Sequence, residues 1–80
     1  MLTLYYRPGC QYYMKVHEAA EALGVTFELK NVFDEGVTDE LIARGGKSQS
    51  PYLVDTEAGL EMYESEDIIS YLRQKFGTEG

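Results

Sequence analysis

The stretch LTLYYRPGCQYYMKV, residues 2–16, decides the fold of this chain. Residues 2–6 are a short apolar and aromatic run that stops at the triplet RPG, which is typical of a buried strand entering a turn. A helical pattern of apolar residues begins directly after the turn, at Cys10, the one cysteine of the chain. A strand followed by a tight turn and a helix predicts an α/β protein.

An amphipathic helix is predicted over residues 10–23, with Gly24 as its stop signal. Its apolar positions recur at intervals of three and four residues: Tyr13, Val16, Ala20 and Leu23. Residues 25–30 then alternate apolar and polar, which is the period of a half-buried strand. A strand, a helix and a second strand in this order predict a right-handed crossover between two parallel strands.

The rest of the chain adds a second helix, a hairpin and a third helix. Residues 38–44 predict a short helix that ends at two glycines, and a five-residue polar connection joins two short strands at 51–55 and 60–63. Ser65 is expected to cap a helix over residues 65–76. The order β-α-β-α-β-β-α predicts a four-stranded mixed sheet with helices on both faces.

Composition limits the functions that the chain can have. Its 80 residues, 44% of them hydrophobic, fit a single domain, residues 1–80. The net charge of −7 opposes binding to nucleic acid or to an anionic membrane.

The amino terminus lacks the pattern of a secretory signal and no stretch reaches membrane-spanning length, so we expect a cytoplasmic protein. We also expect the protein to be a monomer. One cysteine allows no internal disulfide, so any disulfide chemistry must involve a second molecule.

Three motifs resemble the glutaredoxins and the glutaredoxin-like amino-terminal domains of glutathione transferases, both of which have the thioredoxin fold. LYYRPGCQYYMKV, residues 4–16, is similar to the strand, Pro-x-Cys-x-x-Cys turn and first helix of this family. QSPYLVD, residues 49–55, is similar to its cis-proline segment, and MYESEDIISYL, residues 62–72, to the glutathione-carboxylate site of the transferases. The resemblance covers nearly the whole chain and implies a thioredoxin-like (glutaredoxin) fold.

The resemblance also implies a glutathione site, with glutathione as co-substrate. It makes Cys10 the nucleophile, Pro51 the cis-proline beside it, and Ser50 the residue whose backbone pairs with the cysteine part of glutathione. The γ-glutamyl end of glutathione is implied to lie at Ser65 and Glu66, with Glu64 as a transferase-like neighbour.

The sequence departs from the family in three places. Tyr13 stands where the family has its second cysteine, which leaves only a monothiol route, and Ser50 replaces the usual valine. No helical domain like that of the transferases is expected after residue 80.

The residues around the three motifs have structural as well as functional interpretations. Free N–H groups at a helix start, with Arg7 nearby, favour a reactive thiolate at Cys10, but a lone cysteine is also a common small core residue. The start of the last helix needs no ligand if Ser65 simply caps it, yet the same N–H groups can bind a carboxylate while Glu64 or Glu66 receives an ammonium group.

Further side chains complete the predicted site. Tyr6 and Tyr13 are expected to reach the thiol and to shape a glutathione groove. Lys47 and Arg44 are cations that can steer an anionic tripeptide, and Arg7 flanks the turn that carries Cys10. His17 has no second histidine or cysteine with which to share a metal, so no metal site is predicted.

These features predict a glutathione-dependent thiol-disulfide oxidoreductase that removes glutathione from mixed disulfides through Cys10. Its partners are then glutathione and glutathionylated or disulfide-bearing proteins or small molecules. Two alternatives stay open: a glutathione-binding module without turnover, and a carrier of an iron-sulfur cluster ligated by Cys10 and glutathione. The bulky tyrosines of CQYY disfavour the cluster carrier, and the glutathione-carboxylate motif disfavours an arsenate-reductase-like protein.

Overall fold

The computed structural model describes residues 2–77 and contains four strands and three helices in that range. In chain order they are β1 (Leu2–Tyr6), α1 (Gln11–Leu23), β2 (Glu28–Asn31), α2 (Val37–Gly45), β3 (Tyr52–Asp55), β4 (Leu60–Met62) and α3 (Ser65–Phe76). This is the predicted order of elements. None of these helices combines the length and the apolar character that crossing a bilayer requires.

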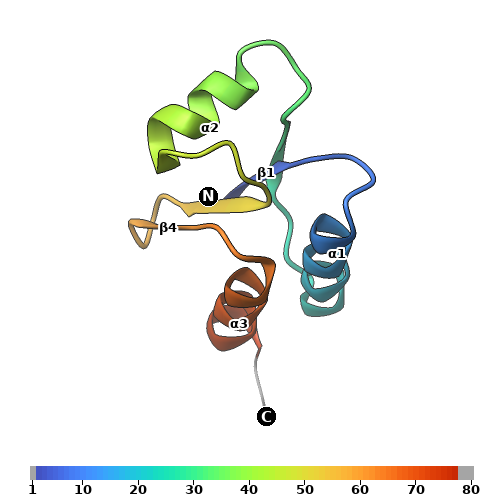
Figure 1. Cartoon of the computed structure of the whole chain (residues 1–80). Helices are drawn as coiled ribbons and strands as arrows, with labels where there is room; N and C mark the ends of the chain where they lie inside the picture. Colours follow the sequence, from blue (N-terminus) through green and yellow to red (C-terminus); the bar gives the residue numbers. More distant parts are fainter. Residues whose placement is uncertain (1, 78–80) are drawn as a thin grey trace.

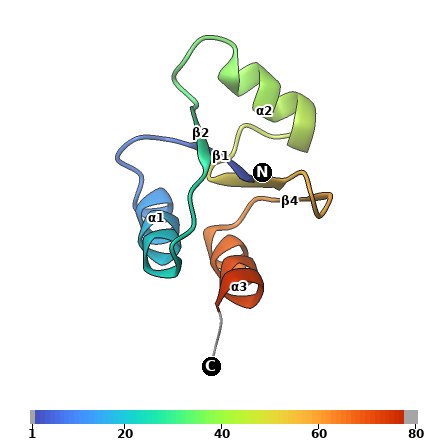
Figure 2. The same ribbon diagram turned by 180° about the vertical axis from the view of Figure 1, so that it is seen from behind.

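The helices lie on both faces of the sheet. Figure 1 shows α1 and α3 side by side beneath the sheet and α2 above it, and the reverse view in Figure 2 shows the same separation. A larger apolar core fills the space between the sheet and the α1–α3 pair and includes Leu4, Leu53 and Leu72. A smaller core lies under α2 and centres on Leu41, the only buried side chain of that helix.

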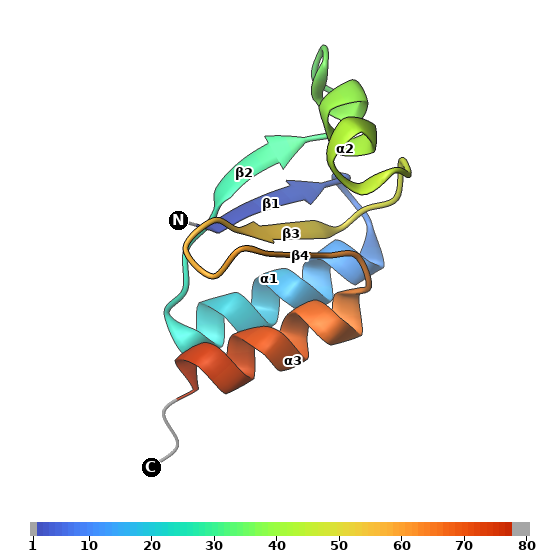
Figure 3. The ribbon, with the colours of Figure 1, turned by 90° about the vertical axis from the view of Figure 1, so that its left-hand side faces the viewer.

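The sheet has the strand order β2-β1-β3-β4, as Figure 3 shows. The β1–β2 pair is parallel, whereas β3 is antiparallel to both β1 and β4. Leu2 pairs with Asp55 and Tyr5 with Tyr52, so the carboxyl end of β1 and the amino end of β3 share one end of the sheet. The predicted thioredoxin-like fold with a mixed four-stranded sheet is confirmed.

Helix α1 begins and ends nearly as the sequence predicts. Cys10 is its N-cap residue with an extended backbone, and the Cys10 carbonyl accepts a hydrogen bond from the Met14 N–H at 3.0 Å. Gly24 ends the helix in the left-handed conformation, with φ of 72°. Few other residues adopt that conformation without strain, which explains the glycine.

The second strand lies later in the sequence than its apolar alternation predicts. It spans Glu28–Asn31, whereas the alternation predicts a strand over residues 25–30. The Val25 N–H donates to the Ala20 carbonyl at 2.8 Å, so Val25 closes α1 instead of starting a strand. Leu29 is 48% exposed because β2 forms an edge of the sheet, where no further strand covers it.

Helix α3 starts at Ser65 as predicted, but the capping role predicted for Ser65 is wrong. Glu64 is the N-cap residue, and its carbonyl accepts the first helical hydrogen bond from the Ile68 N–H at 3.0 Å. No side-chain cap bond closes this helix start, and Ser65 is buried as the first helical residue. The chain enters the helix one residue earlier than a serine cap would require.

A buried carboxylate ties α3 to the end of the sheet farthest from Cys10. Asp55, at the end of β3, is 1% exposed. Its Oδ2 accepts hydrogen bonds from the Tyr71 hydroxyl and the Lys75 ammonium, and its Oδ1 accepts two from backbone N–H groups of the following turn. The hydrogen bonds from Lys75 and Tyr71 hold the pKa of Asp55 well below its ordinary value.

Candidate functional site

Cys10 lies at the junction of β1 and α1, at the end of the sheet that holds the carboxyl end of β1 and the amino end of β3. The Cys10 N–H donates to the Arg7 carbonyl at 3.2 Å, which closes the turn between strand and helix. Its side chain is partly buried and makes no capping hydrogen bond to the helix. The first-turn N–H groups of a 13-residue helix therefore face the region of the thiol without a side-chain cap, an arrangement that favours a negative charge there.

Two tyrosines form an aromatic wall beside this junction. The rings of Tyr6 and Tyr13 lie 4.6 Å apart between centroids, and the Tyr13 ring lies 5.8 Å from that of His17. Burial and the neighbouring Tyr6 raise the pKa of Tyr13. Tyr13 also packs against the larger apolar core, so the position of the family's second cysteine is filled by a packed ring.

The segment before β3 borders a groove of about 480 Å³. The Ser50–Pro51 peptide bond is cis, as the resemblance implied, and Pro51 is buried. Eight residues line the groove: Arg7, Val32, Phe33, Thr38, Leu41, Ser48, Gln49 and Ser50. The structure therefore brings together Arg7 and Ser50 from the predicted set, whereas Cys10 is not among the lining residues.

The three consecutive residues of the β4–α3 junction differ in their surroundings. Glu64 accepts a hydrogen bond from the amide of Gln49 at 3.2 Å, which links this junction to the groove. Ser65 is buried. Glu66 forms an exposed ion pair with Lys15 at 3.4 Å, so it faces α1 rather than the groove; exposed pairs of this kind contribute little to stability.

Lys47 is held in place by hydrogen bonds to its backbone N–H and carbonyl groups. Its N–H donates to the Tyr63 hydroxyl at 3.1 Å, and its carbonyl accepts from the same hydroxyl at 2.9 Å. The ammonium group lies 5.1 Å from the centroid of the Tyr63 ring. The cation predicted to steer a ligand is thus stacked on an aromatic ring.

Several groove residues escaped the sequence-based prediction. Phe33 is 67% exposed and lies under the Arg7 guanidinium, 5.8 Å from ring centroid to Cζ, while Thr38 and Gln49 line the same groove. Phe33 belongs to a loop without periodicity, so no pattern could identify it. Gln49 directly precedes Ser50 and Pro51 and was the one residue that the motif could have indicated.

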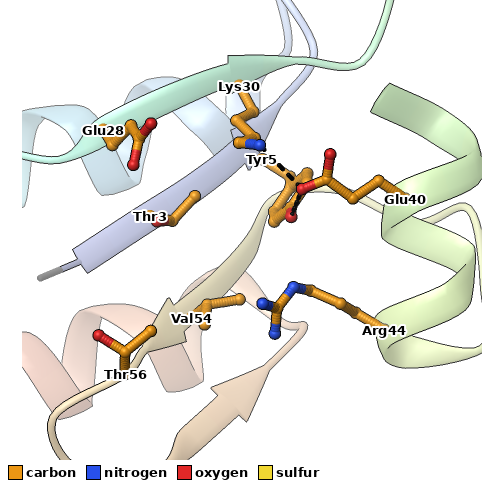
Figure 4. A pocket seen from close by; sticks show the side chains of 8 residues that line it. All are labelled: Thr3, Tyr5, Glu28, Lys30, Glu40, Arg44, Val54 and Thr56. Atoms are coloured by element: carbon orange, nitrogen blue, oxygen red, sulfur yellow. Dashed lines mark hydrogen bonds and ion pairs between the residues drawn. The ribbon is translucent and has the colours of Figure 1, made fainter. Parts of the chain in front are cut away.

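A second, smaller pocket of about 190 Å³ lies between α2 and the sheet, and Figure 4 shows its side chains. Glu40 accepts hydrogen bonds from the Tyr5 hydroxyl and from Lys30, the latter at 2.8 Å. Both bonds lower the pKa of Glu40, while burial and Glu40 raise that of Tyr5. Arg44 donates to Glu61 at 2.8 Å. These paired charges attach α2 to the sheet. No group of three or more potential metal-ligating side chains occurs within residues 2–77.

Comparison with solved structures shows that this fold is similar to that of the glutathione transferases. A delta-class glutathione transferase of Nilaparvata lugens is 32% identical, with a TM-score of 0.83, and covers 99% of this chain. Glutathione S-transferase 1-6 of Anopheles dirus species B is 29% identical over 96% of the chain, with a TM-score of 0.82. Human glutathione transferase theta-2, solved in complex with glutathione and an unknown ligand, is 26% identical over 99%, with a TM-score of 0.82.

This chain corresponds to between 33% and 38% of the length of these three proteins. No curated protein matched it. A family model described as the glutathione S-transferase N-terminal domain matches residues 4–80, and the chain therefore belongs to the family of glutathione S-transferase N-terminal domains.

Proposed function

We propose that this domain binds glutathione and that Cys10 carries out thiol-disulfide exchange with mixed disulfides of glutathione. The observation that supports the chemistry is the position of Cys10, a partly buried thiol at the start of a 13-residue helix that has no side-chain cap. Helix starts of this kind favour the thiolate, which is the attacking species in such exchanges. Family membership and the glutathione complex of the human relative support the ligand.

The proposed reaction has two exchange steps. The Cys10 thiolate attacks the glutathione sulfur of a mixed disulfide; a new S–S bond forms between Cys10 and glutathione, and the partner leaves as a thiolate that takes a proton from water. A second glutathione, as thiolate, then attacks the glutathione sulfur bound to Cys10. Cys10 leaves as the thiolate and oxidised glutathione is released, so each turnover consumes one glutathione thiol and converts the sulfur of the partner from disulfide to thiol.

The groove and the β4–α3 junction are the parts of the site that we assign to the peptide itself. The backbone of Ser50, beside the cis bond to Pro51, is proposed to pair with the cysteine part of glutathione. The uncapped first turn of α3 is proposed to bind the γ-glutamyl carboxylate, with Glu64 near its ammonium group. Glu66 would have to leave its exposed pair with Lys15 to contribute.

Two Cys10 variants test the chemistry. We expect Cys10→Ser and Cys10→Ala to lose at least a hundredfold in the rate of mixed-disulfide reduction, because neither has a sulfur to form the intermediate, while both still bind glutathione. Alkylation of wild-type Cys10 should also be slowed by added glutathione. Wild-type activity no higher than that of the two variants would refute the exchange reaction, and absence of protection would refute binding near the thiol.

Family membership favours a second candidate reaction, the conjugation of glutathione to an electrophile. A hydroxyl at the same helix start can donate a hydrogen bond to the thiolate of glutathione, so Cys10→Ser would then be more active than Cys10→Ala in a conjugation assay. Absence of disulfide exchange in the wild type, together with conjugation by the wild type that falls further in Cys10→Ala than in Cys10→Ser, would assign the site to transfer. Tight glutathione binding without either activity would assign it to a binding module.

The remaining expectations stay predictions. Mixed disulfides of proteins or small molecules are the proposed substrates, and anaerobic reconstitution that yields no cluster absorbance and no dimer would exclude the cluster carrier. The monomeric state and the cytoplasmic location likewise stay predictions.

A further inference from the structure

We propose that Tyr63 is a positioning residue for the glutathione site: its hydroxyl fixes the loop of residues 46–50 against the β4–α3 junction and thereby sets the affinity for glutathione. The inference rests on the proposed glutathione binding described above. It assigns Tyr63 no contact with the ligand and no part in the chemistry of Cys10.

The Tyr63 hydroxyl is bonded twice to one residue of the loop. It accepts a hydrogen bond from the Lys47 N–H at 3.1 Å and donates one to the Lys47 carbonyl at 2.9 Å. A single hydroxyl therefore satisfies both backbone groups of a residue that belongs to neither a helix nor a strand. The loop is held at Lys47 by side-chain bonds, where a regular element would use backbone pairing.

Helix α2 leaves room for this hydroxyl. A β-carbon added to Gly45, the last residue of α2, would overlap the Tyr63 hydroxyl and the ring carbon that carries it. Gly45 does not have a positive φ, so its backbone conformation does not require glycine. The close approach of Tyr63 is therefore the reason that a side chain is excluded at this position.

The same loop carries the groove residues. Ser48, Gln49 and Ser50 line the groove, and Gln49 also donates to Glu64, the residue next to Tyr63. The loop and the β4–α3 junction are thus joined at two adjacent points, Lys47 to Tyr63 and Gln49 to Glu64. Because the proposed ligand contacts lie on both sides of this connection, Tyr63 sets the spacing between them.

The ring of Tyr63 is anchored independently of its hydroxyl. It lies 4.4 Å from the ring of Tyr52 between centroids and packs against the smaller core. Substitution Tyr63→Phe therefore removes the two bonds to the loop and keeps the packing. A loop with more freedom must be ordered when the ligand binds, which lowers affinity without altering the thiol.

The test compares Tyr63→Phe with the wild type in three measurements. We expect the amide of Lys47 to exchange its hydrogen faster, the dissociation constant for glutathione to rise about fivefold, as loss of one net hydrogen bond predicts, and the alkylation rate of Cys10 without glutathione to stay unchanged. In turnover, KM for glutathione should rise while kcat changes little. Gly45→Ala should weaken binding as well, because it displaces the hydroxyl while alanine favours the helix.

Tyr71→Phe is the matched control. It removes a tyrosine hydroxyl that is bonded to Asp55, at the opposite end of the sheet, so it should lower stability and leave glutathione affinity unchanged. Equal weakening of binding in Tyr63→Phe and Tyr71→Phe would overturn the inference, because hydroxyl loss would then act through stability. Wild-type affinity in Tyr63→Phe would also overturn it, whereas a wild type that binds no glutathione would refute the proposed function itself.

Discussion

Asp55 shows how one residue can stabilise this small domain. It is 1% exposed, and its two oxygens accept four hydrogen bonds, two from side chains of α3 and two from backbone groups of the turn after β3. We expect Asp55→Asn to lower the free energy of unfolding by about 2 kcal/mol, because Lys75 loses its charged partner but remains partly exposed to water. Urea unfolding measures this, and Asp34→Asn, at an exposed turn position, should change it by less than about 0.5 kcal/mol.

The depressed pKa of Asp55 gives this prediction a pH dependence. Its hydrogen bonds hold the folded-state pKa below the unfolded value of about 3.9. The contribution of Asp55 is therefore complete above roughly pH 5 and is lost as the pH falls toward the folded-state pKa. The difference in unfolding free energy between wild type and Asp55→Asn should shrink as the pH is lowered from about 5 to 2; a constant difference would show that the charge of Asp55 is not the stabilising feature.

Single residues were predicted well where a local signal marks them and poorly where their partners are distant. The turn RPG placed Cys10 at a helix start, which the structure confirms. Tyr63 gave no such signal, because its hydroxyl bonds to backbone groups 16 residues away. The cap predicted at Ser65 failed because a serine next to a helical run indicates the start of the helix only to within one residue.

Of the three helices, α2 has the fewest buried residues. Leu41 is its one buried residue, and Val37 adds a partly buried contact with the smaller core. Two charged residues of α2, Glu40 and Arg44, line the pocket of Figure 4; Glu40 pairs with Lys30, and Arg44 pairs with Glu61. We expect Leu41→Ala to cost about 2–4 kcal/mol of unfolding free energy, since it empties the centre of the smaller core. The neighbouring Ile42, 42% exposed, is the control, and Ile42→Ala should cost less than about 1 kcal/mol.

Hydrogen exchange distinguishes the attachment of α2 from the stability of the whole fold. The amides of α2 should exchange through a local opening that costs less free energy than global unfolding, because this helix buries so little apolar surface. Exchange of α2 amides at the same free energy as those of β1 and β3 would show that α2 opens only when the entire domain unfolds.

Most elements followed from periodicity, and the exception has a physical reason. The apolar faces of α1 and α3 predicted their positions because both bury a stripe against the same core. The alternation over residues 25–30 misplaced β2 because Val25 and Phe27 pack against that core from a connecting segment. Because alternate residues of this connecting segment are buried, its sequence has the pattern of a strand although β2 starts only at Glu28.

At the scale of the whole molecule, glutathione should stabilise the domain by mass action. Binding to the folded state alone adds about 2.7 kcal/mol at a ligand concentration one hundred times the dissociation constant, which raises Tm by roughly 10 to 20 °C in a domain of this size. A thermal scan over a glutathione series measures this. Acetate at equal ionic strength is the control, and an identical rise with acetate would mean that the charge of the ligand, and not specific binding, stabilises the fold.

The register of β1 against β3 gives the domain two separate ends. Leu2 pairs with Asp55, and Tyr5 pairs with Tyr52. The buried carboxylate of Asp55 and the thiol of Cys10 therefore lie at opposite ends of β1, a strand of five residues. Such a strand spans roughly 13 Å from first to last residue, beyond the distance at which substitutions usually influence one another. Substitutions near Cys10 can therefore accumulate without making the domain less tolerant of substitutions near Asp55. An engineer could redesign ligand choice on this scaffold and strengthen its resistance to heat as two separate tasks.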